Sequence, residues 1–289
     1  FLQIKPGMKG LDATLGYGGH SRKMLEALQG RGHLYALDVD PIEIVKTTKR
    51  LREAGFSEEI FTPISENFAN VDRVAEQYGS FDFLLADLGV SSMQIDNPER
   101  GFSYKQEGPL DLRLNPQNGE PASERLRKMN REEIKGMLID NSDEPYAAEI
   151  ARAIAGRKRK GQKIDTTTKL AELIGETLDF LPEKERKEAV KKSCARVFQA
   201  LRIDVNSEFE VLEAFLTKLP SCMAPGGRIA ILTFHSGEDR LVKRAFKEGK
   251  KAGIYSEVAE DVIRPSSEEC VKNPRAKSTK MRWAVRAEE

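Results

Sequence analysis

The residues best suited to chemistry in this sequence gather in one glycine-rich segment near its start. Gly16, Gly18 and Gly19 follow a short apolar strand and stand directly before His20 and a predicted helix. Glycines let the backbone approach a ligand closely, and the first turn of a helix presents unpaired N–H groups. Asp38 ends the next apolar strand about 20 residues further on, where a carboxylate can accept both hydroxyls of a ribose. The pattern predicts a cradle for a nucleoside cofactor.

The spacing of the glycines separates two kinds of cofactor. A dinucleotide fingerprint, Gly-x-Gly-x-x-Gly, would place its third glycine where this chain has Ser21, so a dehydrogenase is disfavoured. The run Asp12-x-Thr14-x-Gly16-x-Gly18 is similar to the acidic glycine-rich turn of S-adenosylmethionine (SAM) methyltransferases, with Thr14 in place of the first glycine. A tight turn that binds no ligand is the alternative interpretation of this segment taken alone.

Alternating strands and helices are expected to position these residues. Near-continuous apolar strands such as 81–88 are typical of a parallel sheet that is buried on both faces. The carboxyl ends of parallel strands share one edge of an open sheet, and ligands bind at that edge. Four loops should therefore converge there, at 16–20, 38–40, 65–68 and 87–94. Phe68, in the third loop, could lie flat against an adenine ring or serve as a packing aromatic.

The segment after the fourth expected strand, 87–113, has neither helical nor strand periodicity and is rich in polar, glycine and aromatic residues. A loop of this kind at the carboxyl edge of a sheet is usually functional. Methyltransferases that act on exocyclic amines commonly have Asp/Asn-Pro-Pro-aromatic here. Asp87-Leu88-Gly89-Val90 keeps the acid and lacks the rest. Asp87 is therefore the first candidate for a group that acts on an amine or holds SAM.

Ordered motifs along nearly the whole chain resemble the small-subunit ribosomal RNA cytosine-N4 methyltransferase family (RsmH/MraW). These motifs are Gly18-Gly19-His20-Ser21, Asp87-Leu88-Gly89-Val90-Ser91-Ser92-x-Gln94, Glu99-Arg100-Gly101-Phe102-Ser103, Gly108-Pro109-Leu110-Asp111-x-Arg113, Phe198-Gln199-Ala200-Leu201-Arg202-Ile203-x-Val205-Asn206, Phe234-His235-Ser236 and Asn273-Pro274-Arg275-Ala276-x-Ser278. The chain departs from the family at Gly237, where the family usually has leucine, and it lacks the family's N-terminal His-x-Pro-Val-Leu segment.

The resemblance implies a fold, a reaction and a set of site residues. The fold is a class I SAM-methyltransferase, a Rossmann-like doubly wound α/β sheet with an inserted all-helical domain. The reaction is methylation of the N4 amine of a cytidine in the decoding region of small-subunit ribosomal RNA. The residues implied are Asp87 and His235 for catalysis, Gly16, Gly18, Gly19, His20, Asp38, Phe68, Asp87 and Gln94 for the cofactor, and Arg113, Arg202, Asn206, Arg275 and Lys277 for RNA.

The middle of the chain is expected to form the inserted domain. Residues 121–192 have a helical pattern throughout, for example with Ala147, Ile150, Ala151 and Ile154 spaced along one helix face. A single amphipathic helix is predicted over 196–219, followed by strands over 228–234 and 281–286. The expected organisation is a SAM-binding domain made of 1–98 and 196–289, with a helical substrate-recognition domain over 99–195 between its parts.

Two basic runs could contact phosphates, at 152–163 and at 272–286. Neither run contains an acid, and Trp283 lies within the second, a combination that suits single-stranded RNA. A solvated helix end is the alternative for the first run, and Trp283 could equally be a core residue of a final strand. His235 could steer RNA or assist proton loss, or it could simply hydrogen-bond.

Composition limits the remaining possibilities. The formal net charge is +1, so any basic surface is local. Three separated cysteines without a Cys-x-x-Cys suggest a reducing compartment, and the histidines form no metal-spaced cluster. We expect a cytoplasmic protein with SAM as cofactor and small-subunit ribosomal RNA or a 30S-type subunit as partner, and no membrane or metal.

A homodimer is left open. A location in an organelle is also left open, because the chain begins inside a segment. A DNA amino-methyltransferase and a non-catalytic nucleotide-binding module are the alternative functions.

Overall fold

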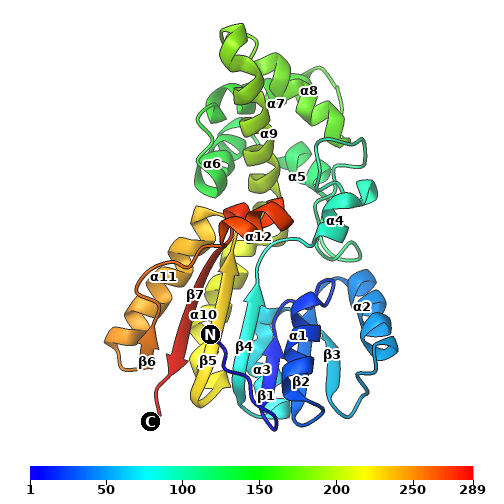
Figure 1. Ribbon diagram of the computed structural model, residues 1–289. Coiled ribbons are helices and arrows are strands. Elements are labelled where there is room, and N and C mark those ends of the chain that lie inside the picture. Colours follow the sequence, from blue (N-terminus) through cyan, green and yellow to red (C-terminus); the bar gives the residue numbers. More distant parts are fainter. Residues whose placement is uncertain (289) are drawn as a thin grey trace. The chain divides into compact units, whose positions relative to one another are not determined.

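The computed structural model describes residues 1–288, which divide into two compact units (Figure 1). The sheet unit comprises Phe1–Gly89 together with the described residues from Phe209 onward, and the helical unit comprises Val90–Glu208. The helical unit is thus inserted into the sequence of the sheet unit. Its bounds are wider than the expected 99–195.

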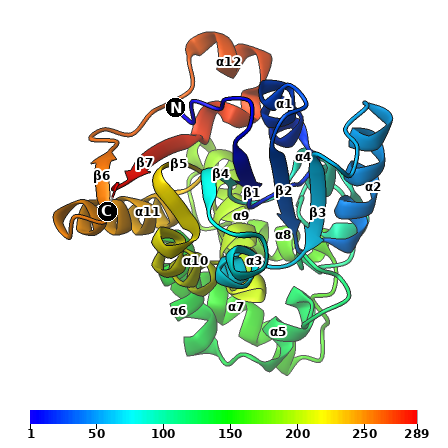
Figure 2. The same cartoon turned by 90° about the horizontal axis from the view of Figure 1, so that it is seen from below.

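The sheet unit is built on seven strands in the order β3-β2-β1-β4-β5-β7-β6 (Figure 2). The first five strands pair in parallel, whereas β7 is antiparallel to both of its neighbours. Strand order reverses between β1 and β4, which is where an open α/β sheet binds its ligand. The strands are β1 (Lys9–Asp12), β2 (His33–Asp38), β3 (Phe61–Ser65), β4 (Phe81–Asp87), β5 (Met223–Thr233), β6 (Tyr255–Val258) and β7 (Lys280–Arg286).

Helices cover both faces of this sheet, so the sheet has two hydrophobic cores. Successive strand side chains point to opposite faces, and Phe83 accordingly packs in one core while Leu84 packs in the other. The first core is closed by α1 (Gly19–Leu28) and α2 (Pro41–Glu53). The second is closed by α3 (Val71–Tyr78), α10 (Glu208–Cys222) and α11 (Ser236–Lys251). Shorter elements are η1 (Phe68–Asn70), α12 (Ser267–Lys272) and η3 (Pro274–Ser278).

The helical unit has a core of its own. The residues Ala147, Ile150, Ala151 and Ile154, expected on one helix face, are all buried in that core. Within residues 1–288, no helix combines the length and apolar character needed to cross a membrane. The helices of the unit are α4 (Ser92–Asp96), η2 (Pro98–Arg100), α5 (Ala122–Lys128), α6 (Arg131–Ser142), α7 (Ala147–Arg159), α8 (Thr167–Thr177) and α9 (Glu183–Asn206).

The single helix predicted over 196–219 is wrong. The chain leaves the helix at Ser207, which has a left-handed backbone with φ of +49°, and α10 begins at the next residue. Asn206 fixes this break, because its side chain accepts a hydrogen bond from Leu114 N and donates one to Leu112 O. These partners are about ninety residues away in sequence, so helix periodicity alone does not reveal the break. The expected boundary at residue 195 consequently lies inside α9.

Candidate active site

The glycine-rich turn lies at the switch point between β1 and β4. It extends the sheet, since Ala13 N donates to Leu85 O at 2.8 Å and Leu15 N donates to Leu37 O at 2.7 Å. Gly18 is needed on two grounds. Its φ is +85°, and a Cβ at this position would lie 2.5 Å from Thr47 Cγ2. The turn therefore brings bare backbone to the start of α1, as expected for a ligand cradle.

Asp12 and Thr14 hold the turn together from inside. Asp12 is fully buried, and its two carboxylate oxygens accept hydrogen bonds from Ser21 Oγ at 2.6 Å and Thr14 N at 3.0 Å. Burial raises the pKa of Asp12. Thr14 Oγ1 accepts a hydrogen bond from Asp87 N at 2.7 Å. Thr14, which stands where related turns have glycine, thus links the turn to the end of β4.

Asp38 is positioned at the end of β2 by two backbone groups. Its oxygens accept hydrogen bonds from Gly16 N at 2.7 Å and from Asp40 N at 2.9 Å. Burial raises the pKa of Asp38 to about 6, against the opposing effect of these two bonds. A carboxylate has about four lone-pair positions, so it can still accept two ribose hydroxyls. Its role toward a ribose stays a prediction.

Asp87 and His20 form a pair at the adjoining strand end. Asp87 Oδ2 lies 3.2 Å from His20 Nε2, and the two side chains are 30% and 51% exposed respectively. Among the described residues, the other oxygen, Oδ1, is buried and has no hydrogen-bond partner. A buried carboxylate oxygen without a partner is costly, which makes Oδ1 a candidate contact for a ligand. Hydrogen bonding to Asp87 raises the pKa of His20.

Helix α2 clamps the glycine-rich turn, a feature that the sequence analysis missed. Thr47 Oγ1 donates to Gly16 O at 2.5 Å, and Arg50 Nη2 donates to Tyr17 O at 3.1 Å. The Arg50 guanidinium also stacks on the Tyr17 ring, 3.9 Å from its centroid. The available signal was the placement of Thr47 and Arg50 one turn apart on the helix that follows Asp38.

Two further candidates of the sheet unit have protein contacts. Phe68 is half-buried and meets Phe215 edge-on, with ring centroids 5.1 Å apart, which is a packing contact. Its contact with an adenine ring stays a prediction. His235 caps the start of α11, and its Nε2 lies 3.2 Å from Glu238 Oε1 without the alignment of a hydrogen bond. His235 is only 9% exposed.

The candidates of the helical unit are engaged within that unit. Gln94 is buried and closes a capping box, with its Oε1 accepting from Ser91 N. Arg113 pairs with Asp111 through two bonds of 2.8 Å, and Arg202 pairs with Glu208 through bonds of 2.8 and 3.0 Å. Together with the Asn206 bonds described above, these contacts give each residue a structural task. A role toward SAM or RNA stays a prediction.

The C-terminal basic run is also largely engaged. Lys272 pairs with Glu268, Arg282 and Lys280 lie against Asp239, and Arg286 donates to two backbone carbonyls. Trp283 lies in β7, paired in register with Ala230, so the final strand of the core alternative is present, but the side chain is only half-buried. Arg275 and Lys277 are exposed in η3.

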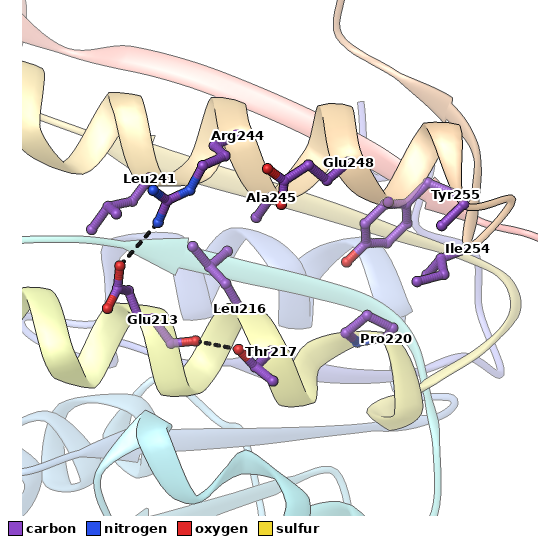
Figure 3. Close-up of a pocket in the computed structure, with 12 residues that line it drawn as sticks. Glu213, Leu216, Thr217, Pro220, Leu241, Arg244, Ala245, Glu248, Ile254 and Tyr255 are labelled. Atoms are coloured by element: carbon purple, nitrogen blue, oxygen red, sulfur yellow. Dashed lines mark hydrogen bonds and ion pairs between the residues drawn. The ribbon is translucent and has the colours of Figure 1, made fainter.

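A groove of the sheet unit lies apart from these residues, between α10 and α11 (Figure 3). Leu216, Leu241 and Tyr255 contribute apolar surface, and the Glu213–Arg244 ion pair of 3.0 Å spans the two helices. None of the candidate site residues lines this groove. The candidate site residues of the sheet unit lie instead at or near the strand ends.

The strand order, the glycine-rich turn at the switch point and the acid ending β2 together define a class I SAM-dependent methyltransferase. The polar groups at this edge fit SAM. Backbone without a Cβ lies at the start of α1, Asp38 can accept ribose hydroxyls, and among the described residues Asp87 Oδ1 has no hydrogen-bond partner.

Comparison with known proteins agrees with this assignment to the methyltransferases. The model of the MraW methylase family matches residues 1–287, and the chain belongs to this family. It is 66% identical to "Ribosomal RNA small subunit methyltransferase H 1" of Lachnoclostridium phytofermentans, over 99% of this chain and 78% of that protein. Identity to the protein of the same name from Agathobacter rectalis is also 66%, over 100% and 82% of the two chains.

Among solved structures, a SAM-dependent O-methyltransferase from Thermotoga maritima is similar with a TM-score of 0.43 and 11% identity, over 99% of this chain and 62% of that one. This likeness is too weak to support anything about the activity. The family membership and the SAM-dependent methyltransferase activity expected from sequence are confirmed by the matches of the preceding paragraph.

Proposed function

We propose that this enzyme methylates the N4 amine of a cytidine in the decoding region of small-subunit ribosomal RNA. The relatives at 66% identity are named as methyltransferases of that RNA, and the sequence motifs supply the expectation of the N4 position. The observation that carries the proposal is Asp87 Oδ1, a buried acceptor without a partner at the end of β4. An acceptor at this place suits a target that carries N–H groups.

The chemistry explains why such an acceptor is needed. The lone pair of a cytosine amine is delocalised into the ring, so the amine is a poor nucleophile. A hydrogen bond from the amine to Asp87 would orient it and disperse the positive charge that develops on nitrogen. SAM, when bound, supplies a methyl group activated by its sulfonium. The remaining task of the protein is alignment of the reacting groups, and the target base must lie outside a helical stack.

The proposed cofactor residues are those of the turn and the neighbouring strand ends. Gly16, Gly18 and Gly19 offer backbone, and Asp38 would accept the ribose hydroxyls. His20, Phe68, Asp87 and Gln94 complete the proposed set, the last of them on the strength of the resemblance alone. His235 is retained as a second candidate near the reaction.

The helical unit is proposed to recognise RNA. Its run over 152–163 has four exposed cations, Arg152, Arg159, Lys160 and Lys163, that make no ion pair within residues 1–288. Arg113, Arg202, Asn206, Arg275 and Lys277 are proposed as further contacts, in keeping with their family motifs. The partner would be the RNA alone or a 30S-type subunit, in the cytoplasm.

The test is methyl transfer from labelled SAM to three acceptors: purified small subunits, naked small-subunit RNA and DNA. Nucleosides from the labelled acceptor are then separated and identified by mass. We expect N4-methylcytidine from the small subunit or its RNA. Label in DNA instead would favour a DNA amino-methyltransferase, and SAM binding without transfer to any acceptor would favour a nucleotide-binding module.

A further inference from the structure

The pair of His20 and Asp87 joins two elements that meet at the cofactor turn. His20 is the second residue of α1, and Asp87 is the last residue of β4. The two carboxylate oxygens of Asp87 lie in different environments. Its Oδ2 faces His20 Nε2 at 3.2 Å, whereas its Oδ1 is buried without a partner among the described residues. The histidine ring is half exposed, with 51% of its side chain accessible.

We propose that His20 and Asp87 act as a proton-accepting pair, in which Asp87 takes the proton that the target amine loses and His20 passes it to solvent. This inference rests on the proposed function, because it requires an amine as the methyl acceptor. In the reaction the amine nitrogen gains the methyl carbon and loses one proton, while the sulfonium becomes a neutral thioether. The lost proton goes first to Asp87 Oδ1. Rotation of the carboxyl group turns this proton toward His20, whose Nε2 accepts it from Asp87. The resulting imidazolium releases its Nδ1 proton to water, which restores the ionised Asp87 and the neutral ring.

The exposure of the two side chains supports this direction of transfer. Asp87 Oδ1 cannot release a proton to water directly, since it is buried. His20 contacts Asp87 through Nε2, and its half-exposed ring can exchange a proton with solvent. A purely structural partner for Asp87 would not need to titrate near neutral pH, and histidine is the side chain that does so.

Charge determines which form of the pair is active. A protonated His20 would stand beside the cationic methyl donor and the positive charge developing on the amine, so the neutral ring is the working form. The charged groups that face His20 are Asp87 on β4 and Asp12 on β1, and both raise its pKa above the ordinary value of 6.5. The rate should therefore rise with pH through a pKa above 6.5 and level off at higher pH.

The first test uses the fact that the chain has three histidines. Each is replaced singly, as His20→Gln, His33→Gln and His235→Gln, and single-turnover methylation of small subunits is followed from about pH 6 to pH 9 at saturating SAM. In His20→Gln we expect the rising limb to disappear and the plateau rate to fall roughly tenfold or more, short of the ~10²–10⁴ typical of a lost acceptor. His33, whose ring bonds to Glu59 O and Thr62 Oγ1 at the amino end of β2, is the matched control and should keep the wild-type profile.

The second test measures the pair without any reaction. The imidazole signals of the free enzyme are titrated by NMR and assigned with the three variants. The His20 pKa should lie above 6.5 in the wild type and fall in Asp87→Asn, with His33 unmoved.

Either of two results would overturn the pair: an unchanged pH limb in His20→Gln, or a His20 pKa that ignores Asp87→Asn. Failure of the proposed function looks different. In that case the wild type forms no N4-methylcytidine, while the NMR titration still reports on the pair.

Discussion

At the scale of single residues, three carboxylates end β1, β2 and β4, and their surroundings prepare them for different tasks. Asp12 is fully buried with both oxygens bonded inside the turn, so it stabilises the turn. Asp38 accepts two backbone N–H groups and retains lone pairs for a ligand. Asp87 alone has a buried oxygen without a partner among the described residues. The three acids are similar in sequence position, and only their contacts distinguish them.

The pKa of Asp38 predicts how SAM affinity depends on pH. Because burial raises this pKa to about 6, the free enzyme takes up a proton at Asp38 as the pH falls below that value. Ribose hydroxyls donate to the ionised form, so SAM binding must release the proton, and affinity should weaken below about pH 6.

Asp38→Asn should remove this pH dependence, and Asp38→Ala should weaken binding at least tenfold at pH 8, since charge-assisted bonds contribute about 1.5–3 kcal/mol each. Calorimetry between about pH 5 and pH 8 checks both statements, with the exposed Glu58→Gln as control. Unchanged affinity in Asp38→Ala would remove Asp38 from the site.

Substitution of Asp87 separates catalysis from cofactor binding. If Asp87 positions the amine, Asp87→Ala should reduce single-turnover methylation by ~10²–10⁴ at saturating SAM. Asp87→Asn keeps one acceptor oxygen and should retain more activity than the alanine variant. A SAM titration accompanies the rates. Full rescue of Asp87→Ala by high SAM would make Asp87 a cofactor ligand only, and a wild-type rate without rescue would place it outside the site.

At the scale of elements, the sequence predicts what local patterns determine. The strands predicted over 81–88 and 281–286 are β4 and β7, and their bounds agree within one residue. Parallel pairing of the first four strands, and with it the gathering of their loops, followed from apolar runs. The break at Ser207 depends on contacts between Asn206 and the distant Leu112 and Leu114, which no periodicity encodes. The pairing of Arg113 with Asp111 was likewise hidden, because the spacing fits either an ion pair or an RNA contact.

The contacts of Thr47 and Arg50 in α2 with the glycine-rich turn should strengthen SAM binding. Thr47→Val removes the hydrogen bond to Gly16 O while keeping the shape of the side chain. Such a bond contributes about 0.5–1.5 kcal/mol, so we expect SAM binding to weaken roughly 2–10-fold. Thr48→Val is the matched control, because Thr48 Oγ1 bonds to Ile44 O within the same helix. Calorimetry that shows equal affinity for the two variants would contradict a role for the clamp.

The ring of Phe209 accounts for the glycine at position 237, where the family usually has leucine. A Cβ at Gly237 would lie 2.6 Å from Phe209 Cζ, so the ring occupies the space that a larger residue would need. Gly237→Ala should therefore lower the free energy of unfolding by ~1–3 kcal/mol, the usual cost of overpacking. Gly156→Ala in α7 is the control. Apart from its chain neighbours and its own helix backbone, no atom of residues 1–288 lies within 4 Å of the added Cβ, and helix propensity should raise stability by ~1 kcal/mol.

Denaturant unfolding compares the two variants. If the ring is responsible, Gly237→Leu should be tolerated better together with Phe209→Ala than alone. Equal destabilisation in both backgrounds would show that Phe209 is not the obstacle.

At the scale of the whole molecule, a net charge of +1 means that attraction to RNA depends on local clusters. The two basic runs differ in how much of their charge is available. In the C-terminal run, Lys272, Lys280, Arg282 and Arg286 have protein partners. In the run of the helical unit, Arg157 pairs with Glu176 and Lys158 donates to Met129 O, whereas its other four cations make no ion pair with any residue of 1–288. The structure thus shifts the expectation of phosphate contact toward the helical unit.

Neutralising the exposed cations of that run tests its role in RNA binding. The variant replaces Arg152, Arg159, Lys160 and Lys163 with alanine, leaving the engaged Arg157 and Lys158 in place. A charge-matched control replaces the exposed residues Arg31, Lys46, Lys247 and Lys251 of the sheet unit. Each phosphate contact contributes about 0.7 to the slope of log K against log salt for a single strand, so the slope should fall by up to about 3 in the first variant. SAM affinity, measured by calorimetry, should stay unchanged because none of the four substituted residues is a proposed cofactor contact. If both variants shift the slope equally, the run at 152–163 is an ordinary solvated surface and RNA is bound elsewhere.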